Sequence, residues 1–195
     1  TIRSQPIGSL CGRVSARVWQ TAVGVLALVT VFTAVTGTYG VVTTKRVPTR
    51  RPTLDGMAYM GYTRAADYAA IKWINARIKG RPVMAEGVGG SYTEFARISA
   101  HTGLPTVLGW PFHEAQWRGG SDLYAGREED IRALYSAGTW TEVLPILDKY
   151  NIQYVYVGPM EISEYGPAGT AKFEAQMTVV YERDGVVIYE MGNDE

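Results

Sequence analysis

The sequence predicts an α/β protein: one N-terminal transmembrane helix, then a small Rossmann-like three-layer domain with a mostly parallel sheet and a C-terminal β-hairpin. Residues 18–44 form a stretch of 27 residues without a charge, long enough for a helix to cross a bilayer. After it, segments with a helical apolar period alternate with short apolar runs, which predicts a mostly parallel sheet covered on both faces. The last two runs, 178–182 and 186–191, are joined across Asp184-Gly185 and predict a hairpin.

The uncharged stretch carries the features of a membrane helix. Its polar residues are Gln20 and several threonines, whose hydroxyls can bond to the helix backbone, and Trp19 and Tyr39 lie where interfacial aromatics belong. Basic residues flank it on both sides: Arg13, Arg17, Lys45, Arg46, Arg50 and Arg51. A signal peptide has a shorter apolar run, and a core helix usually has a polar stripe. We therefore expect a basic segment (1–17), a transmembrane helix (18–44), a linker (45–55) and a soluble α/β domain (56–195).

The N-terminal part of the chain and the remainder differ in net charge. Residues 1–51 hold seven basic residues and no acid, whereas residues 52–195 hold 12 bases and 19 acids, a net charge of −7. A mildly acidic domain disfavours nucleic acid as a partner. Cys11 is alone, so no internal disulfide can form. Three basic residues precede the membrane segment and four follow closely, a small bias toward a cytoplasmic domain.

Period and capping residues predict the elements of the domain. Helices are expected at 64–79 (with Thr63 as N-cap), 92–100 (capped by Ser91), 127–137, 139–150 and 168–176. Strands are expected at 82–88, 106–110 and 152–157, besides the hairpin. Thr139 and Glu142 fit a capping box, and Pro145 is expected to kink or delay its helix.

Unusual residues concentrate between positions 86 and 118, where both histidines of the chain lie. The candidate ligand-binding residues are Glu86, Ser91, Tyr92, Ser99, Trp110, His113, Glu114, Trp117 and Arg118. No nucleophile–base pair and no G-x-S-x-G elbow occurs in the sequence, so no catalytic residue and no cofactor is expected.

Four interpretations of this segment stay open. Gly87, Gly89 and Gly90 suggest a phosphate cradle, although they match neither the G-x-G-x-x-G pattern nor a P-loop. His101 and His113, with Glu86 and Glu114, are possible zinc ligands, but the H-E-x-x-H spacing is missing. Trp110 and Trp117 can present flat faces to a carbohydrate or lipid headgroup, with Glu114 and Arg118 as polar partners. The fourth interpretation is structural: the tryptophans pack and Glu114 pairs with Arg118 four residues on.

The run SYTEFARISAHTGLPTVLGWPFHEAQWRG, followed by REEDIRALY, KYNIQYVYVG and GVVIYEM, resembles the Chlor_Arch_YYY family of polytopic membrane proteins. The resemblance covers residues 55–191, with Ser99, Thr102, Gly103, Trp110, His113, Glu114, Trp117 and Arg118 at matched positions whose roles are not established. That family is similar to C-type membrane glycosyltransferases, which use polyprenyl-linked sugar donors and place the catalytic acid in an early extracytoplasmic loop.

The resemblance implies the last membrane helix and the extracytoplasmic C-terminal domain of such a protein, non-catalytic by itself. We follow it over the charge bias for orientation. The alternative is a single-span accessory subunit of a larger membrane complex, for example an energy-transducing one. The expected partners are membrane lipid, other transmembrane helices or subunits, and a carbohydrate or polyprenyl phosphate.

Overall fold

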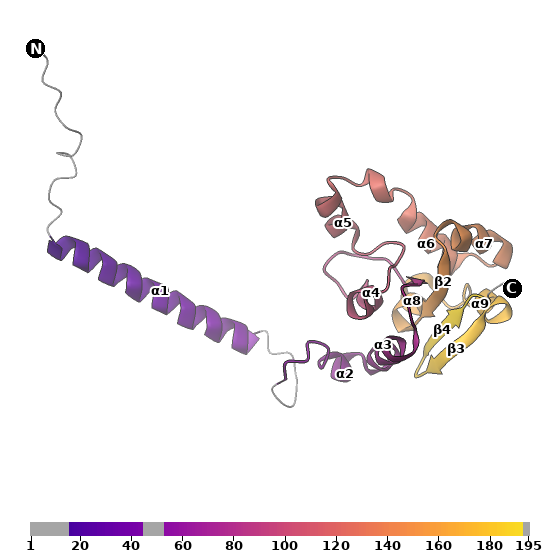
Figure 1. The fold of residues 1–195 in the computed structure, drawn as a ribbon, viewed down its shortest axis with the longest axis horizontal. Coiled ribbons are helices and arrows are strands. Elements are labelled where there is room, and N and C mark those ends of the chain that lie inside the picture. Colours follow the sequence, from indigo (N-terminus) through magenta and orange to yellow (C-terminus); the bar gives the residue numbers. More distant parts are fainter. Residues whose placement is uncertain (1–15, 45–52, 193–195) are drawn as a thin grey trace, which may run out of the picture. The chain divides into compact units, whose positions relative to one another are not determined.

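The computed structural model describes residues 16–44 and 53–192 (Figure 1). The chain divides into two compact units, Thr1–Pro52 and Thr53–Glu195. Residues 1–15 of the predicted basic segment and residues 45–52 of the predicted linker lie outside the described residues.

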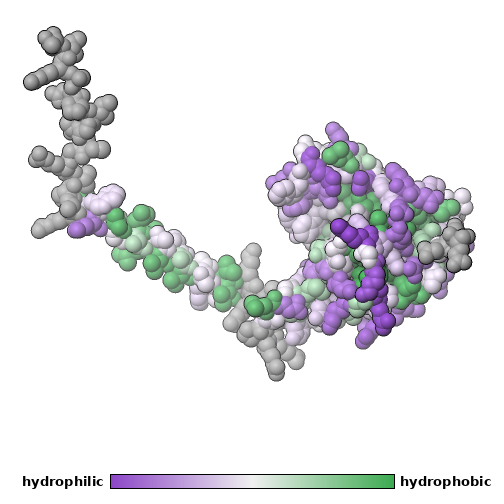
Figure 2. Space-filling view, in the orientation of Figure 1, coloured by the Kyte–Doolittle hydropathy of each residue, from purple (hydrophilic) through white to green (hydrophobic). Residues whose placement is uncertain are grey.

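Helix α1 (Ala16–Thr44) is the described part of the first unit. From Val18 to Thr43 it is long and apolar enough to cross a membrane. Large apolar side chains are exposed all round it, with Leu28 72% and Phe32 68% exposed, and Figure 2 shows green apolar residues along its length. Four threonine hydroxyls donate to the carbonyl oxygen four residues back, at 2.8–2.9 Å: Thr30, Thr33, Thr36 and Thr43. The helix therefore satisfies these hydroxyls internally, as a lipid environment requires.

The second unit is built on a four-stranded mixed sheet in the order β1-β2-β4-β3 (Figure 1). Its strands are β1 (Val83–Ala85), β2 (Ile152–Val157), β3 (Thr178–Arg183) and β4 (Val186–Glu190). Only β1 and β2 pair in parallel; β4 is antiparallel to both β2 and β3. The predicted α/β class is confirmed, but the sheet is mixed and the prediction of a mostly parallel one is wrong, because the C-terminal hairpin inserts its second strand directly beside β2.

The hairpin itself is confirmed. Asp184 (φ 53°) and Gly185 (φ 79°) both adopt positive φ, as the turn between β3 and β4 requires.

The strand predicted at 106–110 does not form. Just before that segment, the Pro105 carbonyl accepts one bond from the Met84 N–H at 3.0 Å, while Val107 and Leu108 are buried outside any strand. Pro105 and Pro111, which lack an N–H, bracket this short segment.

Helices cover both faces of the sheet. They are α2 (Met60–Thr63), α3 (Ala65–Arg77), α4 (Arg97–Thr102), α5 (Pro111–Arg118), α6 (Arg127–Ser136), α7 (Trp140–Lys149), α8 (Pro159–Tyr165) and α9 (Ala171–Gln176), with a short 3-10 turn at Asp122–Tyr124. The helices predicted at 64–79, 127–137, 139–150 and 168–176 are confirmed within a few residues. Pro145 lies inside α7, and the helices α2, α5 and α8 were not predicted.

The helix predicted at 92–100 forms only from Arg97, as α4. Ala96 just before it has a left-handed φ of 62°, which breaks the helix. Ser91 does not cap α4; its Oγ instead accepts the N–H of Phe112, in the first turn of α5, at 2.9 Å. Thr63 is likewise no N-cap, since it is the last residue of α2.

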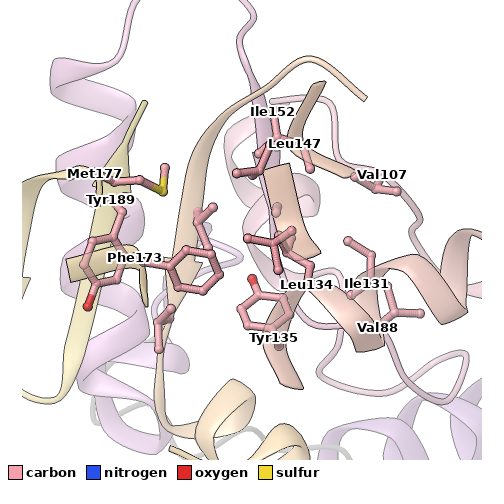
Figure 3. Close-up of a cluster of buried hydrophobic side chains, with 14 of the residues drawn as sticks. Val88, Val107, Ile131, Leu134, Tyr135, Leu147, Ile152, Phe173, Met177 and Tyr189 are labelled. Atoms are coloured by element: carbon pink, nitrogen blue, oxygen red, sulfur yellow. The ribbon is translucent and has the colours of Figure 1, made fainter. Parts of the chain in front are cut away.

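Two apolar clusters, one on each face of the sheet, form the core. Val155 and Val157 of β2 belong to one cluster, and Tyr156 between them belongs to the other, as the alternation of a strand demands. Figure 3 shows the first cluster, where Tyr135 and Phe173 lie among the aliphatic side chains. The continuously apolar β2 is thus buried on both faces, as predicted.

The capping box at the start of α7 offers a local stability test. Both the N–H and the hydroxyl of Thr139 donate to Glu142 Oε2, at 3.1 and 2.6 Å. We expect Thr139→Ala to lower the free energy of unfolding by about 1 kcal/mol, because the helix loses its cap. Urea denaturation followed by circular dichroism measures the change. Thr141→Ala, exposed in the first turn of the same helix, is the control and should cause no loss.

Candidate functional site

Four rings gather where the loop before α4 meets α5. Tyr92 comes from the loop, Trp110 directly precedes α5, and His113 and Trp117 lie four residues apart on that helix. The ring centroids of Tyr92 and Trp110 are 5.3 Å apart, those of Trp110 and His113 are 6.0 Å apart, and those of His113 and Trp117 are 5.9 Å apart. We call these four residues the aromatic surface.

Hydrogen bonds fix the rings of the aromatic surface. The Trp110 Nε1–H donates to the Phe95 carbonyl at 2.6 Å, which holds the indole against the loop. The Tyr92 hydroxyl lies 3.3 Å from His113 Nδ1 and 3.4 Å from Gln116 Oε1. Ser91 ties the loop to α5 through its bond from the Phe112 N–H. The surface is therefore ordered by contacts between two segments far apart in sequence.

The aromatic surface is open to solvent. Trp117 is 77% exposed and Tyr92 is 60% exposed, and the neighbouring Phe112 is 64% exposed. Beside them, Arg118 Nε is 2.5 Å from Glu114 Oε2, the ion pair that the spacing of four residues predicted. Exposed aromatic faces next to a paired carboxylate and guanidinium can contact a ligand that has both apolar and hydrogen-bonding groups.

Two predicted site residues do not line the aromatic surface. Glu86 is buried, and its two oxygens accept the N–H groups of Ile98 and Ser99 at 2.9 and 2.8 Å. Burial raises the pKa of Glu86, although these hydrogen bonds favour its ionised form. The Ser99 hydroxyl donates to the Ala96 carbonyl at 3.2 Å. Both residues hold the start of α4 in place.

The glycines of the suggested phosphate cradle contact the protein itself. The Gly87 N–H donates to Glu161 Oε1 at 3.0 Å. A Cβ at Gly89 would lie 2.3 Å from the Phe95 ring, so this position lacks a side chain because the ring packs there. Gly90 offers its carbonyl to the Thr93 hydroxyl at 2.5 Å. These contacts account for the glycines at 87 and 89 without a ligand.

The suggested zinc ligands do not come together. Among the described residues, no group of three or more His, Cys, Asp or Glu side chains could hold a metal ion. His101 instead bonds through Nδ1 to the Arg97 carbonyl at 2.9 Å, and His113 lies within the aromatic surface.

Beneath the loop lies a buried charge network of Asp67, Arg97 and Glu161. The guanidinium of Arg97 donates to both oxygens of Glu161, at 3.1 and 2.9 Å, and its Nε is 3.1 Å from Asp67 Oδ1. Side-chain exposure in the network is at most 4%. Burial opposes the charge of Arg97, but Glu161 and Asp67 outweigh it and raise the pKa of the guanidinium.

The charge network connects the sheet with the helices on both sides. The Tyr156 hydroxyl of β2 donates to Asp67 at 2.6 Å, and the Arg97 guanidinium lies 5.2 Å from the centre of the Tyr156 ring. Glu161 also accepts the N–H groups of Gly87 and Gly158, both at 3.0 Å. Both ends of the segment from Gly87 to Arg97, which carries Tyr92, are thus fixed to this network.

Sequence reasoning missed Asp67 and Glu161, yet one signal was present. Asp67 lies on the buried face of α3 with Ala70, Ile71 and Ile74, at helical spacing. A carboxylate on an apolar face implies a buried partner, because an unpaired charge there is costly. Glu161 follows the end of β2 in a helix that the sequence did not predict, so its burial carried no comparable signal.

No protein-family model matches the sequence, and no curated protein matches it. Among solved structures, the C-terminal globular domain of an oligosaccharyltransferase from Archaeoglobus fulgidus is similar to this chain, with a TM-score of 0.41 and 15% identity. The alignment covers 65% of this chain and 97% of that domain. These values are too low to transfer a function.

Proposed function

We propose that this chain is a membrane-anchored, carbohydrate-contacting domain, held in the bilayer by α1 and non-catalytic by itself. In this proposal the α/β domain lies outside the cytoplasm and belongs to a glycosyltransferase-like polytopic membrane protein. The observation that carries the proposal is the exposed, ordered aromatic surface. The resemblance of residues 55–191 to the Chlor_Arch_YYY family supports the same assignment.

The chemistry of a sugar suits the aromatic surface. One face of a pyranose ring presents C–H groups that pack on an indole, while its hydroxyls need donors and acceptors at the edge. Trp117 offers the exposed indole, and Glu114 and Arg118 on the same helix offer both kinds of polar partner. A sugar carried on polyprenyl phosphate adds an anion, which Arg118 would accommodate.

Trp117→Ala tests the proposal. Trp117 is 77% exposed, so its truncation should leave the fold intact, and we expect sugar affinity to fall about tenfold. The full chain in detergent micelles, titrated with methyl glycosides and followed by NMR chemical shifts, measures the affinity. Equal binding by the variant and the parent would remove the aromatic surface as the contact site.

The matched control is Trp140→Phe, which changes another tryptophan away from the aromatic surface. Trp140 is half-buried at the start of α7 and packs against the first apolar cluster. Its replacement keeps an aromatic ring there and should leave sugar affinity unchanged.

We propose a single-span accessory subunit as the second candidate, on the evidence of α1. A Cβ at Gly24 or Gly37 would have no atom within 4 Å, so a neighbouring helix can approach closely at these positions. Extraction in mild detergent should then recover the chain with fixed partners, whereas recovery as a free monomer contradicts this candidate.

A further inference from the structure

A pocket of about 170 Å³ opens between Tyr59, just before α2, and the loop that leads into α4. Tyr59, Phe95 and Trp110 give it three aromatic walls, and Ala96 and Ala100 leave it open where larger side chains would fill it. A cavity of about 150 Å³ holds benzene, so this pocket suits a substituent group and not a whole sugar.

The pocket shares Trp110 with the aromatic surface. The indole is fixed by its bond to the Phe95 carbonyl, and it contacts Tyr92 within that surface while also lining the pocket. A ring lying on the aromatic surface can therefore direct one substituent past Trp110 into the pocket.

Backbone strain marks the loop between the two. Tyr92 and Ala96 have left-handed φ values of 59° and 62°, which non-glycine residues adopt at a cost. Ala96 lines the pocket and Tyr92 belongs to the aromatic surface. The contacts of Glu86 with the start of α4 hold the second strained position in place. Such a strained backbone conformation persists only where surrounding contacts hold it in place, and strained residues cluster at binding sites.

The polar residues that line the pocket are Thr93, Glu94, Arg97 and His101, and His101 can accept from a ligand N–H. His101 lines the pocket, and its Nδ1 faces the Arg97 carbonyl at 2.9 Å, so Nδ1 must carry the proton that makes this bond. In the tautomer that protonates Nδ1 alone, Nε2 keeps a lone pair that can accept a hydrogen bond, and no partner for Nε2 occurs among the residues that the structure describes. A small ligand group with one N–H and one methyl matches this lone pair and the apolar walls.

We infer that the pocket binds the acetamido group of an N-acetylated sugar whose ring lies on the aromatic surface. The inference rests on the proposed carbohydrate contact and names the substrate class of that site. The methyl packs among Phe95, Ala96 and Trp110, and the amide N–H donates to His101 Nε2. A sugar with a hydroxyl in place of the acetamido group leaves the apolar walls uncovered and binds more weakly.

The experiment compares methyl glycosides of N-acetylglucosamine and glucose with the full chain in detergent micelles, by NMR titration. We expect the acetamido sugar to bind about tenfold more tightly. Ala100→Leu, at an exposed position of α4 that lines the pocket, should fill it and abolish the tenfold preference while glucose affinity stays the same. Ala133→Leu, exposed on α6, is the matched control and should keep the preference.

Three other outcomes would overturn the inference, and only one of them also overturns the proposed function. Equal affinities for the two sugars in the parent chain overturn the acetamido pocket and leave carbohydrate contact standing. Binding of neither sugar overturns both. A preference that survives Ala100→Leu, with an unchanged thermal unfolding midpoint, places the acetamido group elsewhere and also overturns the pocket.

Discussion

Replacing Arg97 with methionine is expected to lower the free energy of unfolding by about 3–5 kcal/mol, the cost of breaking a buried ion pair from one side. Methionine keeps most of the side-chain volume, so the loss reports charge and hydrogen bonding more than packing. Glu161 would remain buried without its cation and would lose both guanidinium bonds. Asp67 would lose its contact with Arg97 and keep Arg64, 3.8 Å away, as a cationic partner. Urea denaturation of the full chain in micelles, followed by circular dichroism, measures the change.

Arg132→Met is the matched control for Arg97→Met. Arg132 lies on α6 with its side chain 58% exposed, and its nearest carboxylate oxygen, on Glu128, is 4.0 Å away. An exposed pair of this kind contributes little, so we expect a change within about 0.5 kcal/mol. A loss below about 1 kcal/mol for Arg97→Met would mean that water compensates the network and that it does not fix the loop.

The Arg97 result bears on the aromatic surface as well as on stability. The charge network holds both ends of the segment from Gly87 to Arg97, and Tyr92 lies within that segment. Loosening the network should therefore reduce sugar affinity even though none of its members belongs to the aromatic surface. The buried charge network thus holds in position the loop that carries part of the exposed aromatic surface.

Much of the fold was accessible from the sequence because local signals there agree with the tertiary structure. The capping box at Thr139 and the turn at Asp184-Gly185 each form as predicted. These signals act over three or four residues, and the surrounding structure does not oppose them. The same holds for the apolar β2, which is buried on both faces.

Strand order was not accessible in the same way. Nothing local distinguishes a hairpin that ends a parallel sheet from one that inserts beside its central strand, and β4 does the latter. The segment 106–110 has the composition of a strand, but its one ladder-like bond comes from Met84 to Pro105. Val107 and Leu108 are buried in the core although this segment pairs with no strand, so their apolar character does not indicate a strand.

The candidate site was predicted in part. Trp110, His113 and Trp117 stand out in the sequence as unusual residues close to one another, and in the structure they lie together with Tyr92. Glu86 and Ser99 stand out in the same way, but they support α4 from inside. The pocket depends on Tyr59 and Ala100, which are distant in sequence and chemically ordinary, so no sequence pattern indicated them.

Placing arginine at Val31 is expected to prevent stable insertion of α1 into a bilayer. Val31 lies near the middle of Val18–Thr43 and is 61% exposed. A charged side chain at the centre of a membrane helix costs about 2.5–3.5 kcal/mol on insertion scales, which corresponds to roughly a hundredfold shift in the insertion equilibrium. The measurement is the fraction of chain in vesicles that resists alkaline carbonate extraction, for the parent and for Val31→Arg.

Val42→Arg separates the membrane position from the charge itself. Val42 lies close to the end of the span, where a long arginine side chain can reach the headgroup region, so we expect insertion close to that of the parent. A helix that merely projects into water would tolerate arginine equally at both positions, because both side chains are already exposed. Equal extraction of the two variants and the parent would therefore remove the membrane anchor, and with it the placement of the aromatic surface near lipid-linked sugars.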